Sequence, residues 1–119
     1  MSKWKCGIFI FSGRSNPEWE IKAEVGNDFV KYWMNLEKSD NHVELQGRLG
    51  YSGCFFELRE QKWVCYNTLV SKYENSKLME SKADYERKLE KKIILSIPNK
   101  IRTEFSTDSE IEKIVKNFG

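Results

Sequence analysis

The hydrophobic positions near the N-terminus alternate as they do in a β-strand. Within residues 3–11, one face carries four apolar side chains, namely Trp4, Cys6, Ile8 and Ile10. The other face carries Phe9 and Phe11. Apolar side chains on both faces predict a strand inside a sheet that is covered on both sides. Gly13 and the pair Asn16–Pro17 end the strand, and the sequence EWEI then resumes as a short extended segment.

The next segment shows helical spacing. Four apolar residues recur along one stripe and predict an amphipathic helix over residues 24–38, namely Val25, Phe29, Trp33 and Leu36. Gly26 and Asn27 weaken its first turn, so we expect Asn27 to act as the N-cap. The polar segment at residues 38–42 then ends the helix.

Residues 53–70 give the clearest β-signal, two strands that meet at a tight turn near Glu60–Gln61. This turn predicts a register with Leu58 opposite Trp63 and Phe56 opposite Cys65. Cys54 then lies diagonal to Cys65, at a distance of about 7–8 Å that argues against a disulfide.

The last third of the chain carries helical signals. Ser81 and Asp84 form a variant capping box before a helix over residues 82–97, which Pro98 stops. The apolar stripe of this helix is Tyr85, Leu89 and Ile93. Thr107 and Glu110 form a second capping box before a C-terminal helix.

These elements predict one α+β domain over residues 1–119. A small, mostly antiparallel sheet, built from the N-terminal strand and the 53–70 hairpin, packs against about three helices. A chain of 119 residues is long enough for a single core without disulfides or metals.

Charge and cysteine content indicate which partners and which cellular compartment to expect. The net charge of +2, from 20 basic and 18 acidic residues, disfavours a general nucleic-acid binder. No apolar run approaches the roughly 18 residues of a membrane helix, and the N-terminus lacks the order of a signal peptide. Three cysteines without tight spacing fit a reducing compartment. We therefore expect a cytoplasmic protein without membrane contact.

Catalytic and metal signals are weak. His42 is the single histidine, and the cysteines form no ligand spacing, so neither a metal nor another cofactor is predicted. Cys6, Cys54 and Cys65 fall inside predicted strands, where a thiol behaves as a small hydrophobe. A small hydrolase or transferase that uses one of these thiols with an unidentified base is an alternative hypothesis.

Two loops carry the candidate binding residues. In the loop 12–19, Arg14 offers a planar fork for a carboxylate or phosphate. Asn16 can satisfy loop backbone groups, and Trp19 can form an apolar wall. The glycine-rich loop 47–53 adds Tyr51. Two interpretations of Arg14 stay open, since it either clasps carbonyl groups of the second loop or faces a ligand.

A third interpretation concerns the basic side chains of the predicted helix 82–97, namely Arg87, Lys88, Lys91 and Lys92. Glu86 and Glu90 interrupt this cluster, which is typical of a solvated helix face. The alternative is a surface for a protein or RNA partner.

The two loops together resemble a family of small uncharacterised proteins. Its members carry a Phe-Ser-Gly-Arg-Pro-Asn-Pro-x-Trp motif near the N-terminus and a Leu-Gly-Tyr-x-Gly-Phe motif after the first helix. This chain has FSGRSNPEW at 11–19 and LGYSGCFFE at 49–57, with Ser15 in place of the proline and Cys54 where an aromatic or aliphatic residue is common. YERKLEKKIILS at 85–96 is also similar to that family's C-terminal region. The resemblance implies the same order of elements and no known reaction, and it draws attention to Arg14, Asn16, Trp19, Gly50 and Tyr51.

The sequence therefore predicts a non-enzymatic binding module for a small molecule or a protein. Its candidate site comprises Arg14, Asn16, Trp19 and Tyr51, and its oligomeric state is left open.

Overall fold

The strands form a single antiparallel sheet. The computed structural model describes residues 3–10, 16–44, 51–104 and 109–118, and seven strands lie within them. In spatial order they are β2 (Glu18–Ile21), β1 (Trp4–Ile8), β4 (Cys54–Leu58), β5 (Gln61–Tyr66), β6 (Leu69–Glu74), β7 (Lys77–Ala83) and β3 (Glu37–Lys38). Four helices occur in the same described residues, α1 (Ala23–Met34), α2 (Lys88–Ile94), α3 (Asn99–Glu104) and α4 (Ser109–Phe118). The predicted α+β class is confirmed, with a larger sheet than expected.

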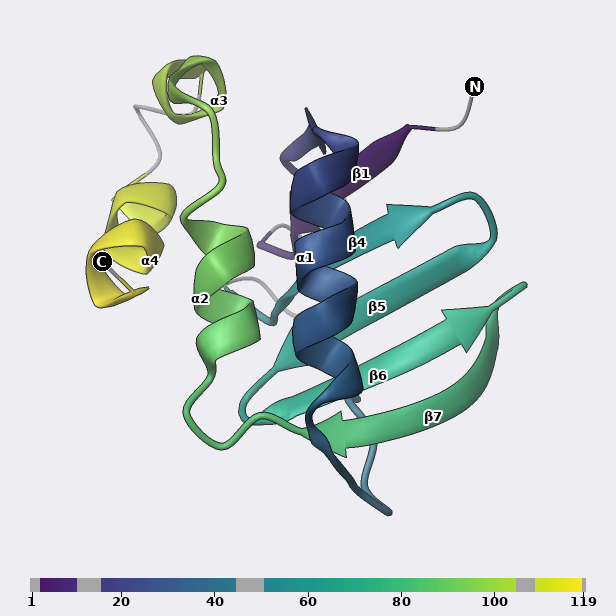
Figure 1. The fold of residues 1–119 in the computed structure, drawn as a ribbon. Helices are drawn as coiled ribbons and strands as arrows, with labels where there is room; N and C mark the ends of the chain where they lie inside the picture. The colour runs from purple at the N-terminus through teal and green to yellow at the C-terminus, as the bar shows by residue number, and fades with distance from the viewer. Residues whose placement is uncertain (1–2, 11–15, 45–50, 105–108, 119) are drawn as a thin grey trace.

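The main core lies between the sheet and two helices. α1 and α2 lie side by side across one face of the sheet, and α4 packs against α2 on the side away from α1 (Figure 1). The alternation predicted for the first strand is confirmed, because Trp4, Cys6 and Ile8 point into this core and Phe9 points to the opposite face. Phe11 lies outside the described residues.

A smaller cluster lies on the opposite face. Phe55 and Val64 are buried there under Val43, and Phe9 packs against them. The backbone N–H of Val43 donates to Ser71 Oγ at 2.8 Å, and Ser71 pairs with Ser81 at 2.8 Å. This segment after α1 therefore covers part of the second face.

Helix α1 starts earlier than predicted. Its N-cap is Lys22, so the assignment of Asn27 as the cap is wrong. Gly26 is buried inside the helix, where a Cβ atom would overlap the ring of Trp4. The glycine that weakens the local helix propensity is thus explained by close packing against the first strand.

The end of α1 is held by a buried lysine from β7. Lys82 is 8% exposed, and its Nζ donates to the carbonyls of Trp33 at 3.2 Å and Met34 at 3.3 Å. A cation at this position satisfies orphan carbonyl groups and complements the helix dipole.

The hairpin β4–β5 turns one residue earlier than predicted. The turn residues are Arg59 and Glu60, with Arg59 in the left-handed region at φ 56°. This moves the register by two positions, so Phe56 faces Trp63 and Cys54 faces Cys65 directly. The predicted register and the diagonal placement of the cysteines are wrong, although all three cysteines are free, as expected.

Residues 69–83 form a hairpin that the sequence analysis missed. Its turn is Asn75–Ser76, and the turn Asn67–Thr68 joins it to β5; all four of these residues have positive φ. Consequently the helix expected over 82–97 spans only α2, and the assignment of Ser81 to a capping box is wrong because Ser81 lies in β7.

Asp84 does cap a helix, but it lies before α2 and not in the first turn of a helix that begins near Ser81, as the predicted capping box required. Asp84 accepts hydrogen bonds from the backbone N–H groups of Lys88 at 3.1 Å and Leu89 at 2.8 Å, and so caps α2. The chain turns again before Pro98, whose carbonyl accepts from Ile101 in α3. Thr107 of the other predicted capping box lies outside the described residues.

Candidate functional site

The structure places the predicted site residues in different surroundings. Asn16 Oδ1 accepts the backbone N–H of Ile10 at 2.6 Å, as the expected role in the loop backbone requires. Trp19 is 5% exposed in the core, and its Nε1 donates to Ser96 Oγ at 3.1 Å. Arg14 and residues 47–50 lie outside the described residues.

Tyr51 differs from these residues because it lines an open pocket, which we call the tyrosine pocket. The volume of this pocket is about 390 Å³. Its walls come from the loop before β4, the β5–β6 turn, the start of α2 and the last turns of α4. The lining residues are Tyr51, Tyr66, Asn67, Arg87, Lys113, Ile114, Asn117 and Phe118. Neither Asn16 nor Trp19 is among them.

A buried carboxylate binds two of the residues that line the pocket. Glu90 is 1% exposed and accepts a hydrogen bond from the hydroxyl of Tyr51. Arg87 binds the same carboxylate through two atoms, with Nε at 2.9 Å from Oε1 and Nη2 at 2.7 Å from Oε2. This two-point geometry fixes the guanidinium and compensates the buried charge.

Aromatic rings surround this network. The Tyr51 ring makes edge contacts with Tyr66 at 6.0 Å and with Phe118 at 6.3 Å between ring centroids. The Arg87 guanidinium lies 4.9 Å above the Phe118 ring. Burial, followed by the negative character of neighbouring groups, raises the pKa of Tyr51 well above its usual value, so its hydroxyl stays protonated as a donor.

The local sequence explains how Arg87 reaches Glu90. Asp84 holds the first backbone N–H groups of α2, and the Arg87 N–H donates back to the Asp84 carbonyl at 2.8 Å. Arg87 itself adopts a left-handed conformation at φ 56°, directly before the helix. Its side chain then lies over the first helical turn and pairs with Glu90, three positions on. Gly53, at φ 124°, similarly permits the sharp entry into β4 after Tyr51.

Glu90 was missed because it stands in a basic cluster, which suggested solvent exposure. A signal was nevertheless present. Glu90 shares helical spacing with Ile93, Ile94 and Ile97, all of them buried. Its position on that stripe places the carboxylate on the inner face of α2.

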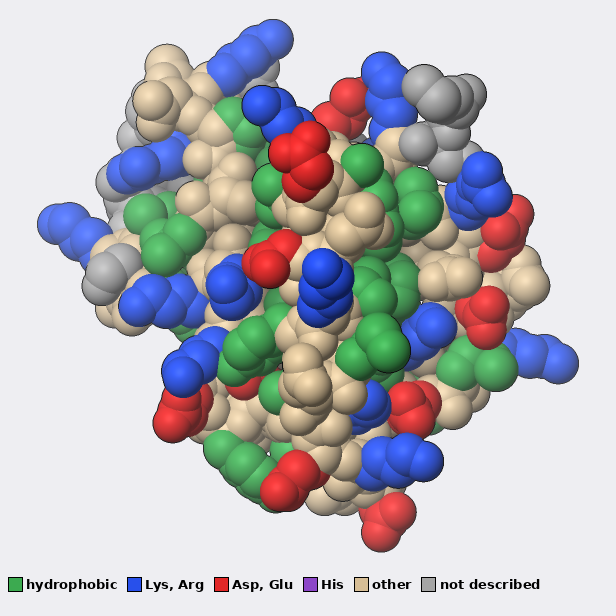
Figure 2. All heavy atoms as spheres, viewed as in Figure 1, with side chains coloured by type: hydrophobic (Ala, Val, Ile, Leu, Met, Phe, Trp, Pro, Cys, Tyr) green, Lys and Arg blue, Asp and Glu red, His purple; other side chains and the backbone are tan. Residues whose placement is uncertain are grey.

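The basic residues of α2 do not form a patch of one sign. Lys88 pairs with Glu86 at 2.8 Å, and Lys92 lies 3.6 Å from Asp28 on α1. On the helix side of the molecule, Lys and Arg side chains lie beside Asp and Glu side chains (Figure 2). This mixture counts against a nucleic-acid surface on α2.

The cysteines are poorly placed for nucleophilic chemistry. Cys6, Cys54 and Cys65 are each at most 1% exposed. Burial raises the pKa of all three thiols above 9.0, their ordinary value. A thiol must ionise to attack a substrate, so these surroundings count against the cysteine-dependent enzyme. In the part of the chain that the structure describes, no three His, Cys, Asp or Glu side chains group as metal ligands would.

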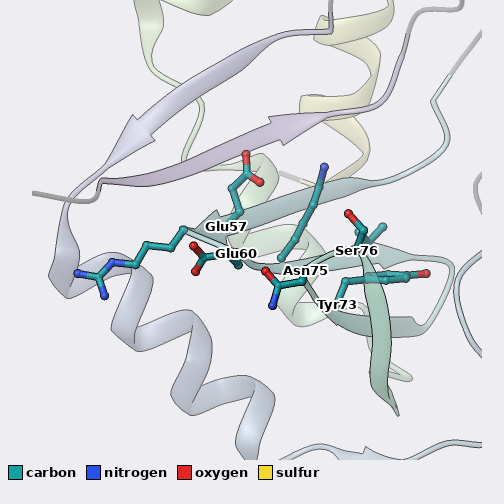
Figure 3. Close-up of a pocket in the computed structure, with 8 residues that line it drawn as sticks. Glu57, Glu60, Tyr73, Asn75 and Ser76 are labelled. Carbon is teal, nitrogen blue, oxygen red and sulfur yellow. The ribbon is translucent and has the colours of Figure 1, made fainter.

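A second hollow, of about 570 Å³, lies at the other end of the sheet. It is formed between the β4–β5 turn and the β6–β7 turn and has the lining residues Glu57, Arg59, Glu60, Lys62, Val64, Tyr73, Asn75 and Ser76. Figure 3 shows Glu57, Tyr73 and Ser76 arranged around it from different strands and turns. Its lining carries charges of both signs, whereas the charged residues described in the lining of the tyrosine pocket are Arg87 and Lys113.

Comparisons with known proteins add no further residues to either site. No protein-family model, curated protein or solved structure matches the chain. The resemblance to the family of small proteins therefore stays a prediction. None of the helices among the described residues is long and apolar enough to cross a membrane.

Proposed function

We propose that the chain is a non-enzymatic binding module whose tyrosine pocket holds a small ligand with a planar group and a negative charge. The observation that carries this proposal is the guanidinium of Arg87, fixed by Glu90 and stacked on Phe118 at the pocket wall. A pocket of about 390 Å³ is large enough for such a ligand.

The charge of the lining supports an anion. Arg87 and Lys113 line the pocket, and none of the lining residues that the structure describes is acidic. Glu90 uses only two of the five guanidinium N–H groups, and the other three have no protein partner among the described residues. The Arg87 side chain is 37% exposed, so these groups can meet a carboxylate or phosphate.

The aromatic walls support a planar group. Tyr51, Tyr66 and Phe118 contribute three ring surfaces around one opening. Asn67 and Asn117 add amide groups at the rim, which suit polar substituents of a ring. The proposal keeps Tyr51 from the sequence-based site and replaces its other members. The three free, buried thiols support the expected cytoplasmic location.

The test is a titration of ¹⁵N-labelled protein, followed by two-dimensional NMR, with benzoate, benzamide and inorganic phosphate as probes. Benzoate combines ring and charge, whereas each of the other probes lacks one of them. We expect benzoate to shift the amides of Tyr51, Asn67 and Phe118 at millimolar concentration, with binding about tenfold tighter than that of either other probe. Equal binding of benzoate and benzamide would contradict the role of the guanidinium.

Two variants sharpen the test. Lys113→Gln removes a cation from the rim, and we expect benzoate affinity to fall by about threefold to tenfold while benzamide binding is unchanged. Lys100→Gln is the matched control, because Lys100 is an exposed lysine of α3 outside the pocket. Absence of any probe-dependent shift around Tyr51 would refute a binding site for planar anions there.

A further inference from the structure

A row of alternating charges crosses the second face of the sheet, and it leads to an inference independent of the proposed ligand. Four residues stand directly opposite one another on adjacent strands, in the order Glu20, Lys5, Glu57 and Lys62. We call them the charge row. Since Trp4 and Cys6 point to the helix side, Lys5 and its cross-strand neighbours point to the other side.

The charge row is accessible in the described structure. The side chains of Lys5 and Glu20 are 45% and 65% exposed. Glu57 and Lys62 are half-buried and line the hollow of about 570 Å³ near the hairpin turns (Figure 3). Val43, which covers part of this face, contacts Ser71. Ser71 pairs with Val64, two residues further along β5 from the hairpin turn than Lys62, so Val43 lies beside the charge row and not over it.

Two of the four charges in the row have ion-pair partners in the described chain, and two do not. Lys5 pairs with Glu18 at 3.3 Å, and Glu20 pairs with Lys3 at 3.5 Å. By contrast, Glu57 and Lys62 make no ion pair with any other described residue, and Lys62 Nζ lies 4.2 Å above the ring of Phe55. A partner with a carboxylate facing Lys62 and a basic side chain facing Glu57 would give each of them an ion pair.

The order of signs in the row makes it complementary to itself. A two-fold axis parallel to the strands, between β1 and β4, exchanges the positions of Lys5 and Glu57 and those of Glu20 and Lys62. In two copies stacked face to face about this axis, every charge of the row meets the opposite sign. Such a rotation also preserves the twist of the sheet, so the two faces stay parallel.

We propose that this face is a docking surface for a second copy of the same chain, which pairs sheet to sheet as a symmetric dimer. Lys5 then faces Glu57 of the second copy, and Lys62 faces Glu20 of the second copy. The hollow beside Lys62 receives the projecting side chains of the second copy's β2. Half-buried Phe9 and Tyr73 supply apolar contact beside the charges.

The association is weak and depends on salt, because each new ion pair includes one exposed side chain, Lys5 or Glu20, and solvent and salt screen such a pair. Sedimentation equilibrium of the full chain tests it. We expect monomers at low protein concentration, dimers as the concentration approaches millimolar in low salt, and about tenfold weaker dimerisation in high salt. A monomer at every concentration in low salt would overturn the proposal.

Charge-segregated variants test the pairing itself. The double variant Lys5→Glu/Lys62→Glu makes the row acidic, and Glu20→Lys/Glu57→Lys makes it basic. We expect each variant alone to stay monomeric and an equal mixture of the two to form dimers. Two results would refute the assigned surface. One is a mixture that stays monomeric while the wild type dimerises, and the other is a double variant that, on its own, dimerises like the wild type.

Two controls protect this interpretation. Lys31→Glu/Lys91→Glu makes the same change in charge at exposed positions on the helix side and is expected to dimerise like the wild type. Circular dichroism of each variant checks that it folds. Should a charge-reversed variant fail to fold, Lys5→Gln/Glu57→Gln replaces it, and dimerisation as tight as that of the wild type would then overturn the proposal.

Discussion

The hydroxyl of Tyr51 donates a hydrogen bond to the carboxylate of Glu90, which is 1% exposed. The two residues come from the glycine-rich loop and from α2, so this single bond connects the pocket rim to the packing of the helix. Because Arg87 binds the same carboxylate, the three side chains act as a unit. Substitutions in this unit separate stability from ligand binding.

Tyr51→Phe keeps the aromatic ring and removes the donor. We expect the free energy of unfolding to fall by about 1–3 kcal/mol, because a buried carboxylate loses one of its hydrogen bonds. Benzoate binding should persist, since the ring wall and Arg87 remain. Urea denaturation measures the first effect, and Tyr85→Phe, at a tyrosine that is 75% exposed, is the matched control. A loss equal to that of the control would show that the bond contributes nothing.

Arg87→Ala leaves Glu90 buried without its cation. We expect a loss of about 3–5 kcal/mol in unfolding free energy, because a buried charge without compensation is costly. Arg87→Ala/Glu90→Gln should recover part of this loss, since the glutamine carries no charge. Chemical denaturation measures the free energy of unfolding of the two variants. A double variant no more stable than Arg87→Ala would argue against a charge effect.

Gly26→Ala tests the contact between α1 and β1. Alanine is favoured over glycine in a helix by about 1 kcal/mol, but the added methyl group would overlap the ring of Trp4. Overpacking costs about 1–3 kcal/mol, so we expect no net gain and a loss of up to about 2 kcal/mol. The control is Asn27→Ala, at the exposed neighbouring position, which should stabilise. Stabilisation by both substitutions would contradict the close contact.

The buried thiols predict how stability depends on pH. Their pKa values are raised above 9.0 in the folded protein, so the folded state keeps protons that the unfolded chain releases. Stability is therefore complete below the ordinary thiol pKa and falls as pH rises beyond it, by about 1.4 kcal/mol per pH unit for each thiol.

Denaturation at about pH 8 and about pH 10 measures this slope, and Cys6→Ala should reduce it by one thiol's share. The same burial predicts that a thiol-specific reagent reacts slowly with the folded protein at neutral pH and rapidly after unfolding. Rapid reaction of a thiol in the folded state would revive the cysteine-dependent enzyme.

Sequence patterns predicted the helices and strands in which apolar side chains recur at a regular spacing. Alternation identified β1 because each face of that strand packs against a separate apolar cluster. The hairpin β6–β7 was missed because it is mostly polar. Neither its own turn, Asn75–Ser76, nor the turn that precedes it, Asn67–Thr68, contains a glycine. Pairing with a neighbouring strand, which a single sequence does not display, stabilises such strands.

The candidate site was predictable only in part. The glycine-rich loop drew attention to Tyr51, which does line a pocket. Trp19 was expected to form an apolar wall of the binding site and is buried in the core, since an aromatic residue in a short strand fits a core equally well. The partnership of Arg87 with Glu90 depends on a left-handed residue before α2, and a conformation of this kind leaves little trace in residue types.

The position of α1 in the chain has a mechanical consequence. Strands β2 and β3, which precede and follow this helix directly, are the two outermost strands of the sheet. The helix therefore connects the two edge strands of the sheet, and neither edge strand can separate from the sheet without disturbing the packing of α1. Native-state hydrogen exchange should report nearly equal opening energies for amides in β2, α1 and β3, so that the periphery opens as one cooperative unit.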